Sequence, residues 1–559
     1  MSPPAASRSP TRASRVLQGW LPFASAWALV VLAAIHLLAR FNAQALDVST
    51  LFSADNLYLP SLYRDLFEEG GRWAGWKLTP APYFFPDMGL YFALDALTGP
   101  VVHALVGYAL AQCVLLGLAA QWLARTVAPH DTAAQAQALA VGVVAALLLA
   151  CAEGRLELMQ YAALNATHFS LVPLVAVALA LLLRAVRDRS RLAPGALALL
   201  CVLASASDSL FVVTFTAPAL LCLGGMAWLG RPGLSPRWVG SVAGLVLLAT
   251  VVGSRVPRWL SPWRTGGFTR ARLTEAPEAL GRLVEAMGEQ FQASPAVGMT
   301  WVLLVLLAAG CVVSRRAWAA PGSERWALYA LCLFIVLVLG TTLGAVVLTG
   351  QFENKGNFRY LLVPALLPFL LLAFLPALLQ HEPLRRALSV GALGLVAAAL
   401  AGSMLRHPWR AEGPLTSGFH PPLVECLDAR RARHGLGWGV ADYWVAKLVT
   451  TFSRTGLRVH QVLPDGRLYH WINNLDWYLG RRGDDSDYTF VITQGLSTDA
   501  FTAKYGAPRE VFHCGGFEVF LYGRDLDAPL RAQFARETKL LEPARAGGEP
   551  SPTGHARPE

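Results

Sequence analysis

The sequence predicts an all-α polytopic membrane domain of about eleven helices, followed by a small C-terminal α/β domain. Of the 559 residues, 54% are hydrophobic and only 15% are charged, and the mean hydropathy is +0.43. Long apolar stretches separated by short arginine-containing turns recur from Leu17 to Leu405. A helix needs about 20 apolar residues to cross the hydrocarbon core of a bilayer. After residue 406 the composition becomes mixed polar and aromatic.

The apolar stretches set the boundaries of the predicted segments. The spans are 17–39, 99–124, 133–152, 168–186, 193–207, 209–229, 237–254, 297–314, 326–349, 361–379 and 387–405. Outer loops 40–98 and 255–296 are unusually long for connections between spans. Residues 1–16 precede the first span, residues 406–541 form the C-terminal domain, and the Pro/Gly-rich segment 542–559 is predicted to be disordered.

The placement of arginines orients the spans. Short loops rich in Lys and Arg stay in the cytoplasm, whereas long loops do not follow this rule. One set of alternate connections, together with the N-terminus, carries these arginines: Arg8, Arg12, Arg15, Arg125, Arg184, Arg187, Arg189, Arg191, Arg231, Arg237, Arg315, Arg316, Arg325, Arg385 and Arg386. The N-terminus is therefore predicted to be cytoplasmic and, after an odd number of spans, the C-terminal domain to lie outside.

The bias in composition indicates a bacterial source, and the spans with their arginines indicate the compartment. Arginine outnumbers lysine, and alanine, glycine and leucine are abundant, which is typical of a GC-rich bacterial genome. We therefore expect a multi-pass protein of the bacterial inner membrane with a periplasmic C-terminal domain. The formal net charge of +10 fits contacts with anionic headgroups of membrane lipids, and we expect no nucleic-acid partner.

The cysteines divide between the two parts of the chain. Six lie within predicted spans, where cysteine acts as a small apolar residue, and the other two, Cys426 and Cys514, lie in the C-terminal domain. A pair exported to an oxidising periplasm could form a disulfide. Two unpaired thiols are the alternative.

The first outer loop contains a candidate interfacial helix. From Asn56 to Glu69, apolar residues recur at helical spacing, and the polar residues Arg64, Asp65, Glu68 and Glu69 are predicted to face water. A short helix lying flat on the membrane surface fits this pattern. Trp73 and Trp76, which follow it, suit an interfacial belt of aromatic residues.

Asp55 stands at the predicted start of that helix. One interpretation is a helix cap, since an anionic side chain is favoured there. The other is a general base whose pKa is raised by partial burial at the membrane surface. Asp87 is a second acid in the same loop, either a plain turn residue or a ligand for substrate. Together the two acids could hold a divalent cation such as Mg²⁺ or Mn²⁺ through oxygen ligands.

This layout resembles the GT-C superfamily of integral membrane glycosyltransferases. The resembling features are a cytoplasmic N-terminus, one span, and then a long outer loop whose early Asp leads into an interfacial helix. The resemblance implies a sugar donor carried on polyprenyl phosphate, and it implies that Asp55 is the catalytic residue. A paired Asp-Glu, frequent in protein-mannosyltransferase-like members, is absent because Asn56 follows Asp55. The subfamily is therefore left open.

Basic residues in two other outer segments are candidates for substrate binding. Lys355, Arg359 and Tyr360 precede a proline-bearing span, and an Arg-Tyr pair at such a place is similar to a recurring feature of the same enzymes. Arg359 and Lys355 could hold a lipid-linked phosphate, or snorkel to headgroups instead. Arg255 and Arg258, among the aromatic residues of loop 255–296, could form a second lipid-phosphate site or an interfacial anchor.

Asp208 and the C-terminal domain leave further alternatives open. Asp208 lies in an apolar region, where a charged group is either functional or a helix cap. His168 in a neighbouring outer loop is more often structural than a metal ligand. In the C-terminal domain we expect a helix over 440–453, strands over 457–463 and 488–493, and a hairpin formed by 510–513 and 517–522.

The sequence therefore predicts a glycosyltransferase with its active site at the periplasmic face. Asp55 would deprotonate an acceptor hydroxyl, Arg359 and Lys355 would stabilise the leaving phosphate, and Asp87 would orient the acceptor or a metal ion. The acceptor could be a glycan, a lipid or a protein. The alternatives are a flippase or transporter for a lipid-linked sugar, an O-antigen polymerase or ligase, and a non-catalytic assembly protein.

Overall fold

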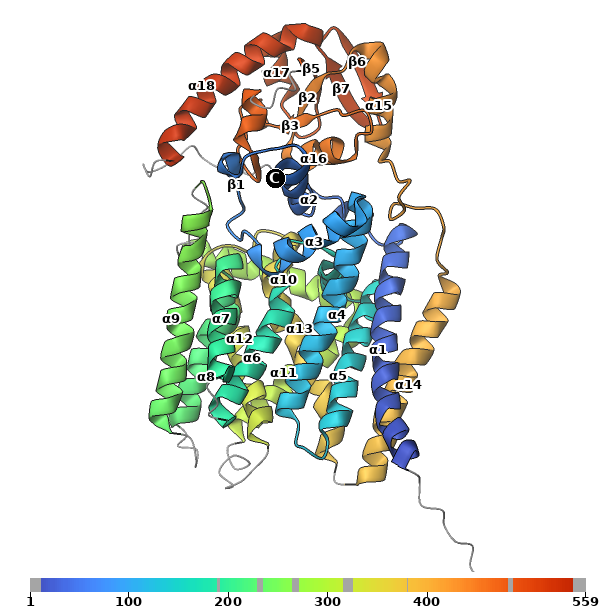
Figure 1. Cartoon of the computed structure of the whole chain (residues 1–559), viewed down its shortest axis with the longest axis vertical. Coiled ribbons are helices and arrows are strands. Elements are labelled where there is room, and N and C mark those ends of the chain that lie inside the picture. Colours follow the sequence, from blue (N-terminus) through green and yellow to red (C-terminus); the bar gives the residue numbers. More distant parts are fainter. Residues whose placement is uncertain are drawn as a thin grey trace, which may run out of the picture.

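The structure is a computed structural model, and it describes residues 12–188, 192–228, 235–263, 271–314, 325–379, 381–480 and 486–545. Several of the predicted orienting arginines lie outside these residues, namely Arg8, Arg189, Arg191, Arg231, Arg315 and Arg316. A helical bundle carries a smaller domain with a β-sheet at one end, and α1 begins at the other end of the bundle (Figure 1). The predicted combination of a polytopic helical domain and a C-terminal α/β domain is confirmed.

The bundle consists of apolar helices of different lengths. They are α1 (Arg12–Asn42), α4 (Val101–Val127), α5 (Ala133–Ala152), α6 (Leu171–Asp188), α7 (Leu192–Ser207), α8 (Ala217–Trp228), α9 (Pro236–Leu260), α11 (Pro295–Val313), α12 (Trp326–Leu348), α13 (Leu362–Leu366) and α14 (Glu382–Arg406). A 3₁₀ helix, Leu367–Phe374, continues α13. Among the described residues, 8 helical segments are long and apolar enough to cross a membrane.

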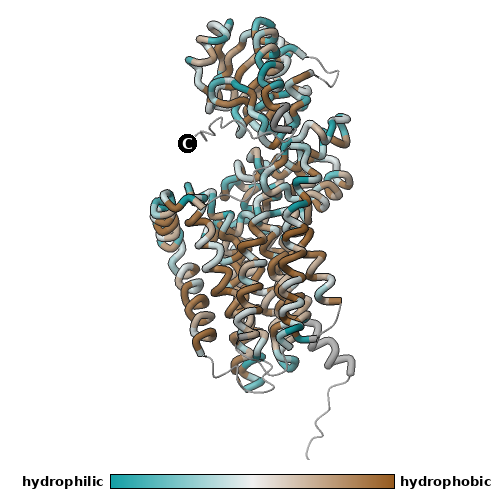
Figure 2. Tube along the Cα trace, turned by 90° about the vertical axis from the view of Figure 1, so that its left-hand side faces the viewer, coloured by the Kyte–Doolittle hydropathy of each residue, from teal (hydrophilic) through white to brown (hydrophobic). Residues whose placement is uncertain are grey.

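The remaining predicted spans fall on shorter or more polar helices. The prediction 168–186 coincides with α6, and the predictions 193–207 and 209–229 coincide with α7 and α8. Apolar residues form a band through the bundle, and polar residues gather at its two ends (Figure 2). Several helices turn most of their residues outward. In an apolar stretch of 18 residues, only 17% of the residues of α11 and 22% of those of α14 are buried. An outward apolar surface of this kind suits contact with lipid.

The C-terminal domain is built on a mixed sheet of 5 strands in the order β3-β2-β5-β7-β6. The strands are β2 (Trp438–Ala441), β3 (Val459–Gln461), β5 (Tyr488–Ile492), β6 (Glu510–Cys514) and β7 (Phe517–Leu521). β2 pairs in parallel with β3 and β5, and β7 pairs antiparallel with β5 and β6. The predicted hairpin at Gly515 and Gly516 is confirmed, because both glycines adopt positive φ angles between β6 and β7.

Helices cover both faces of this sheet. Leu427 of α15 (Pro422–His434) and Val449 of α16 (Tyr443–Phe452) pack with Phe490 on one face. Leu530 of α18 (Asp527–Arg545) packs with Val491 on the other. The prediction of a helix over 440–453 was wrong at its start, because β2 extends to Ala441 and Asp442 caps α16 by accepting from Val445 N at 3.0 Å. α17 (Thr498–Tyr505) lies between β5 and β6 in the chain.

The predicted disordered segment is partly helical. α18 continues to Arg545, so the first four residues of 542–559 belong to a helix, and the rest lie outside the described residues. α14 ends at Arg406 and α15 begins at Pro422, and the stretch between them connects the bundle to the C-terminal domain (Figure 1).

The first outer loop folds into short helices that pack beneath the C-terminal domain. They are α2 (Tyr58–Tyr63), the π-helix Arg64–Glu68, the π-helix Phe84–Met88 and α3 (Gly89–Thr98). The helix predicted from residue 56 to residue 69 is present, but two predictions about its surroundings were wrong. Asp65 is 1% exposed and Trp76 is 0% exposed, because the C-terminal domain covers both side chains, so neither faces water or the membrane interface.

Paired strands and hydrogen bonds hold the two parts together. β1 (Trp76–Lys77) of the outer loop pairs antiparallel with β4 (Asn473–Asn474) of the C-terminal domain. The Asp65 carboxylate accepts from Trp76 Nε1 at 2.6 Å and from Trp477 Nε1 at 2.7 Å. Arg72 binds both oxygens of Asp476 at 2.8 Å. The C-terminal domain therefore packs against the first outer loop.

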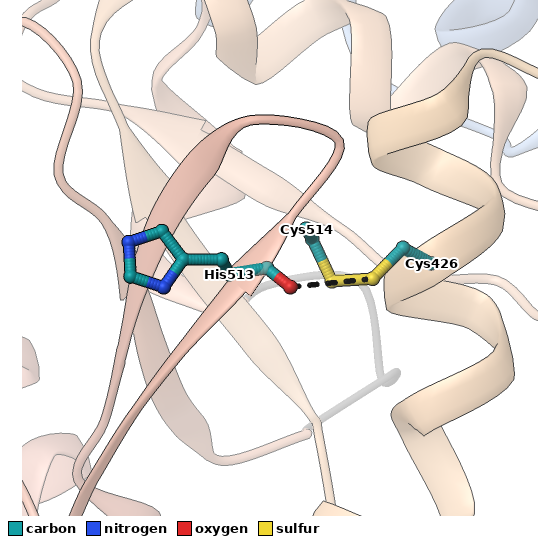
Figure 3. The surroundings of a disulfide bond; sticks show 3 residues. All are labelled: Cys426, His513 and Cys514. Carbon is teal, nitrogen blue, oxygen red and sulfur yellow. Dashed lines mark hydrogen bonds between the residues drawn. A yellow bond between two sulfur atoms is a disulfide. The ribbon is translucent and has the colours of Figure 1, made fainter.

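A disulfide joins Cys426 of α15 to Cys514 of β6 (Figure 3). The Cα atoms are 5.4 Å apart, and 88 positions separate the two cysteines in the sequence. His513 O lies 3.7 Å from Cys426 Sγ beside the bond. The other six cysteines are free and belong to the bundle. The bond therefore fastens the first helix of the C-terminal domain to the β6–β7 hairpin.

Candidate active site

Asp55 lies where the bundle meets the C-terminal domain, and it binds a residue from each. Its Oδ2 accepts from Arg359 Nη1 at 2.9 Å, and its Oδ1 accepts from Tyr443 Oη at 2.5 Å. Asp55 stands before the N-cap of α2, which is Leu57 and has no side-chain cap. The capping interpretation was therefore wrong, since both oxygens of the carboxylate point to other partners. The side chain keeps 23% of its surface exposed, so the group is accessible.

The electrostatic surroundings of Asp55 differ from the expected ones. Burial raises the pKa of this carboxyl, but the charge of Arg359, the hydrogen bonds from Tyr443 and Arg359, and the charge of Lys447 outweigh burial, so the pKa lies below its usual value. The expected raised pKa was therefore wrong for this arrangement. The carboxylate is ionised at neutral pH and is held at both oxygens.

Arg359 belongs to the 3₁₀ helix Lys355–Leu361, which the Asn354 side chain caps. This segment projects Arg359 toward Asp55 and places Tyr360 beside it, with the guanidinium carbon 5.5 Å from the centre of the Tyr360 ring. The Tyr360 ring packs against His168 at 5.3 Å. The predicted Arg-Tyr pair therefore occupies the same site as Asp55.

Next to this pair, His168 joins two other buried groups. Its Nδ1 lies 2.5 Å from Asp208 Oδ2, and its Nε2 lies 3.1 Å from Tyr83 Oη. The other oxygen of Asp208 accepts from Leu210 N at 2.9 Å. Asp208 therefore closes the turn after α7 and contacts His168, but it is not the predicted helix cap, because the N-cap of the next helix is Phe211. Tyr83 and His168 adopt left-handed backbone conformations, with φ of 58° and 68°, which side chains tolerate only where surrounding contacts hold them.

The other predicted residues lie elsewhere. Lys355 is 67% exposed and pairs with Glu289 of α10 (Ala276–Ala293) at 2.5 Å, so it is not part of the group around Asp55. Arg255 and Arg258 lie exposed near the end of α9. The end of α9 contacts the first outer loop, because Trp73 Nε1 donates a hydrogen bond of 2.8 Å to Leu260 O.

Asp87 is buried below the surface, with 1% of the residue exposed. Its Oδ1 accepts from Tyr108 Oη at 2.5 Å. Burial raises its pKa, against smaller opposing effects of hydrogen bonds from Tyr108 and Ser170. A role of Asp87 in orienting the acceptor or a metal ion stays a prediction. Asp55 and Asp87 thus have different partners, and no cluster of three or more His, Cys, Asp or Glu suited to a metal ion occurs in the described part of the chain.

An apolar pocket adjoins the segment that carries Arg359. Its cavity volume is about 80 Å³. Residues of α10, α11, α12 and the segment from the 3₁₀ helix into α13 line it, among them Phe291, Trp301, Leu343, Phe358, Leu361 and Pro364. Phe358 and Leu361 of this lining belong to the same 3₁₀ helix as Arg359. An apolar surface and a cation carried by one short element suit a ligand with an anionic head and an apolar chain.

Sequence reasoning missed two residues of this group. Tyr443 is one of many aromatic residues in the C-terminal domain, and no motif singles out Lys447. Lys447 is 3% exposed, and its ammonium lies 4.1 Å from the centre of the Tyr443 ring. The available signal was their spacing of four residues on an apolar helix, which places both side chains on one face.

No protein-family model and no curated protein sequence matches the chain. Among solved structures, it is similar to two crystal structures of the oligosaccharyltransferase of Archaeoglobus fulgidus. For the complex with Zn and sulfate, the identity is 11%, the TM-score is 0.43, and the match covers 83% of this chain and 67% of the other. For the apo form, the values are 13%, 0.42, 84% and 69%. Similarities of this size assign neither a family nor an activity to the chain.

Proposed function

We propose that the chain is a glycosyltransferase of the bacterial inner membrane that moves a sugar from a polyprenyl-phosphate carrier to a periplasmic acceptor with inversion. The observation that carries this proposal is the contact between Asp55 and Arg359 at 2.9 Å. This contact lies between the bundle and the C-terminal domain, and the 3₁₀ helix that carries Arg359 also lines an apolar pocket. A carboxylate, a guanidinium and an apolar surface together match the parts of a lipid-linked sugar phosphate.

The donor would use the guanidinium and the apolar pocket at once. Arg359 can grip a phosphate through two parallel N–H donors, while the polyprenyl chain occupies the pocket lined by Phe358 and Leu361. Lys355 pairs with Glu289 outside the group around Asp55, so the proposal gives it no part in holding the phosphate.

The reaction would proceed by in-line displacement. An acceptor hydroxyl attacks the anomeric carbon, its proton passes to Asp55, and the bond from that carbon to the phosphate oxygen breaks on the opposite side. The leaving phosphate gains negative charge, and Arg359 stabilises it because the cation is already fixed in place. The sugar ends on the acceptor with inverted configuration, and the carrier departs as polyprenyl phosphate.

Donor binding would also prepare Asp55 for this task. In the structure the charge of Arg359 is the largest of the effects that lower the pKa of Asp55, while burial raises it. A phosphate that takes over the guanidinium weakens this effect, and the raising effect of burial then gains weight. Asp55 would therefore become a stronger base only when a donor is present. Because Asp55 and Asp87 have different hydrogen-bond partners, we assign no step of the reaction to a divalent cation.

The proposal is tested by mass spectrometry of lipid-linked sugars in cells from which the chain has been deleted. We expect a polyprenyl-phosphate sugar to accumulate in the outer leaflet and to disappear when the wild-type chain is restored. A donor confined to the inner leaflet would indicate a flippase instead. Accumulation of lipid-linked oligosaccharide repeats would indicate a polymerase or ligase. Unchanged lipid-linked sugars would contradict the proposal.

A further inference from the structure

One face of α16 enters the candidate active site from the C-terminal domain. Tyr443, the first residue of this helix, reaches Asp55 with its hydroxyl at 2.5 Å. Lys447, one turn later, lies under the ring of Tyr443 at 4.1 Å and donates to Gln461 Oε1 at 3.2 Å. The charge of Lys447 also acts on Asp55. Three groups therefore form a line from Lys447 through Tyr443 to the carboxylate.

Several contacts fix the position of α16 relative to the outer loop. Arg64 donates to the backbone carbonyl of Thr450 in α16 at 3.0 Å. The rings of Phe52 and Phe452 meet edge to face with centroids 5.2 Å apart. These contacts hold the last turn of the helix that Tyr443 begins, so packing of α16 as well as its own hydrogen bond holds the hydroxyl at Asp55.

We propose that Tyr443 and Lys447 are positioning residues for Asp55, so that the active site is complete only when the C-terminal domain is seated on the bundle. This inference rests on the proposed function in one respect, namely that Asp55 is the reacting carboxylate. Tyr443 donates a hydrogen bond to Oδ1, and Arg359 donates one to Oδ2. These two bonds fix the orientation of the carboxylate and therefore the direction of its remaining lone pairs. A fixed carboxylate is what an acceptor hydroxyl needs for attack along one line.

Lys447 acts on Asp55 through the Tyr443 ring as well as through space. A cation over an aromatic face is attracted to it and draws electron density from the ring, which makes the phenolic hydroxyl a stronger hydrogen-bond donor. Burial lowers the pKa of Lys447 to about 7, against an opposing effect of Asp55. The strength of this contribution therefore changes near neutral pH.

Every titratable or charged group near Asp55 enters its titration. Among the described residues, those that interact with it electrostatically include Arg359, Tyr443, Lys447, Tyr83 and Tyr161. Tyr83 lies in the first outer loop and Tyr161 in the 3₁₀ helix Glu157–Ala163, so neither is altered when residues of the C-terminal domain are changed. A change in the titration of Asp55 on substitution of Tyr443 or Lys447 therefore reports the contribution of α16.

Infrared titration of the full-length protein in liposomes tests this inference without any substrate. The carbonyl band of protonated Asp55 is identified as the band that is missing in Asp55→Asn. We expect Tyr443→Phe, which keeps the ring, to move the titration midpoint of this band to higher pH, and Lys447→Met to move it in the same direction. Tyr505→Phe is the matched control, since it removes a buried hydroxyl contact to Gln533 in the same domain, and we expect no change.

The result that overturns the inference is a midpoint in Tyr443→Phe and Lys447→Met equal to that of the wild type. If Tyr443→Phe does not fold, Lys447→Met alone decides. Turnover of the lipid-linked sugar gives a second measurement: kcat should fall by about tenfold in Tyr443→Phe, with an unchanged KM for the donor. A shifted midpoint in a protein that turns over no lipid-linked sugar would remove the proposed function, while the effect of Tyr443 and Lys447 on Asp55 would stand.

Discussion

Tyr443 of the C-terminal domain donates a hydrogen bond of 2.5 Å to Asp55 of the first outer loop, 388 positions earlier in the chain. On the other side of the same carboxylate stands Arg359 of the bundle, at 2.9 Å. Neither domain alone contains this arrangement. The C-terminal domain is therefore part of the candidate site rather than an appendage to a membrane enzyme.

Substitution of Arg359 should impair the handling of the donor phosphate. We expect Arg359→Gln to lower turnover of the lipid-linked sugar by about 100-fold, and Arg359→Lys to retain part of it, since lysine supplies a charge without the two-pronged grip. Turnover is measured in membranes that contain the accumulated donor. Arg272→Lys is the control, because that exposed arginine pairs with Glu275 outside the site. Full turnover by Arg359→Gln would exclude a phosphate-binding role.

The burial of Lys447 should make the free energy of unfolding depend on pH in the alkaline range. Its pKa is lowered by burial to about 7 in the folded protein, whereas an unfolded lysine titrates near 10.4. Between these values the unfolded chain binds one proton more than the folded chain, so stability rises with pH. Thermal unfolding between about pH 7 and pH 10 should show this rise in the wild type and a weaker one in Lys447→Met. Equal slopes would contradict the burial of a neutral amine.

The disulfide predicts a difference between reduced and oxidised protein. Cys426 and Cys514 close a long loop, and a bond of this kind stabilises a domain by about 2–4 kcal/mol. Reductant should lower the melting temperature of the C-terminal domain in the wild type, and it should have no effect on Cys426→Ser/Cys514→Ser. Protein isolated from cells without reductant should carry the bond if this domain faces the periplasm. Free thiols at both positions would argue for the opposite orientation.

Asp65 should control the seating of the C-terminal domain. Its carboxylate accepts from two indole N–H groups, and Asp65→Asn would set an amide N–H₂ against one of them. We expect a loss of about 2–4 kcal/mol and faster proteolysis of the segment 407–421. Asp525→Asn, which changes an exposed partner of Arg509, provides the control. Cleavage of both variants at the wild-type rate would show that Asp65 does not hold the domains together.

The sequence predicted the parts of the fold that depend on local patterns. Length and hydropathy located the helices, such as α5 over the predicted 133–152, and alternation with glycines located the β6–β7 hairpin. The burial of Asp65 and Trp76 could not be predicted in this way. Their surroundings come from Trp477, about 400 residues away, and an amphipathic pattern cannot distinguish a covering domain from a membrane surface.

For the candidate site, the sequence indicated single residues but not the contacts between them. Asp55 and Arg359 each stood out as charged residues beside apolar segments, but their contact bridges 304 positions and leaves no local signal. The pKa of Asp55 was expected to be raised because burial alone was considered. Arg359, Tyr443 and Lys447 reverse its direction, and all three come from distant segments. Lys355 was grouped with Arg359 by proximity in sequence, whereas the 3₁₀ helix between them turns the two side chains to different partners.

Turnover of the accumulated lipid-linked sugar by Asp55→Asn tests the central claim most directly. Asp95→Asn is its matched control, since Asp95 of α3 is another buried outer-loop carboxylate, 5% exposed. With both variants folded and inserted, we expect Asp55→Asn to lose at least about 100-fold in turnover and Asp95→Asn to stay close to the wild type. Turnover by Asp55→Asn at the wild-type rate would contradict the assignment of Asp55 as the reacting carboxylate.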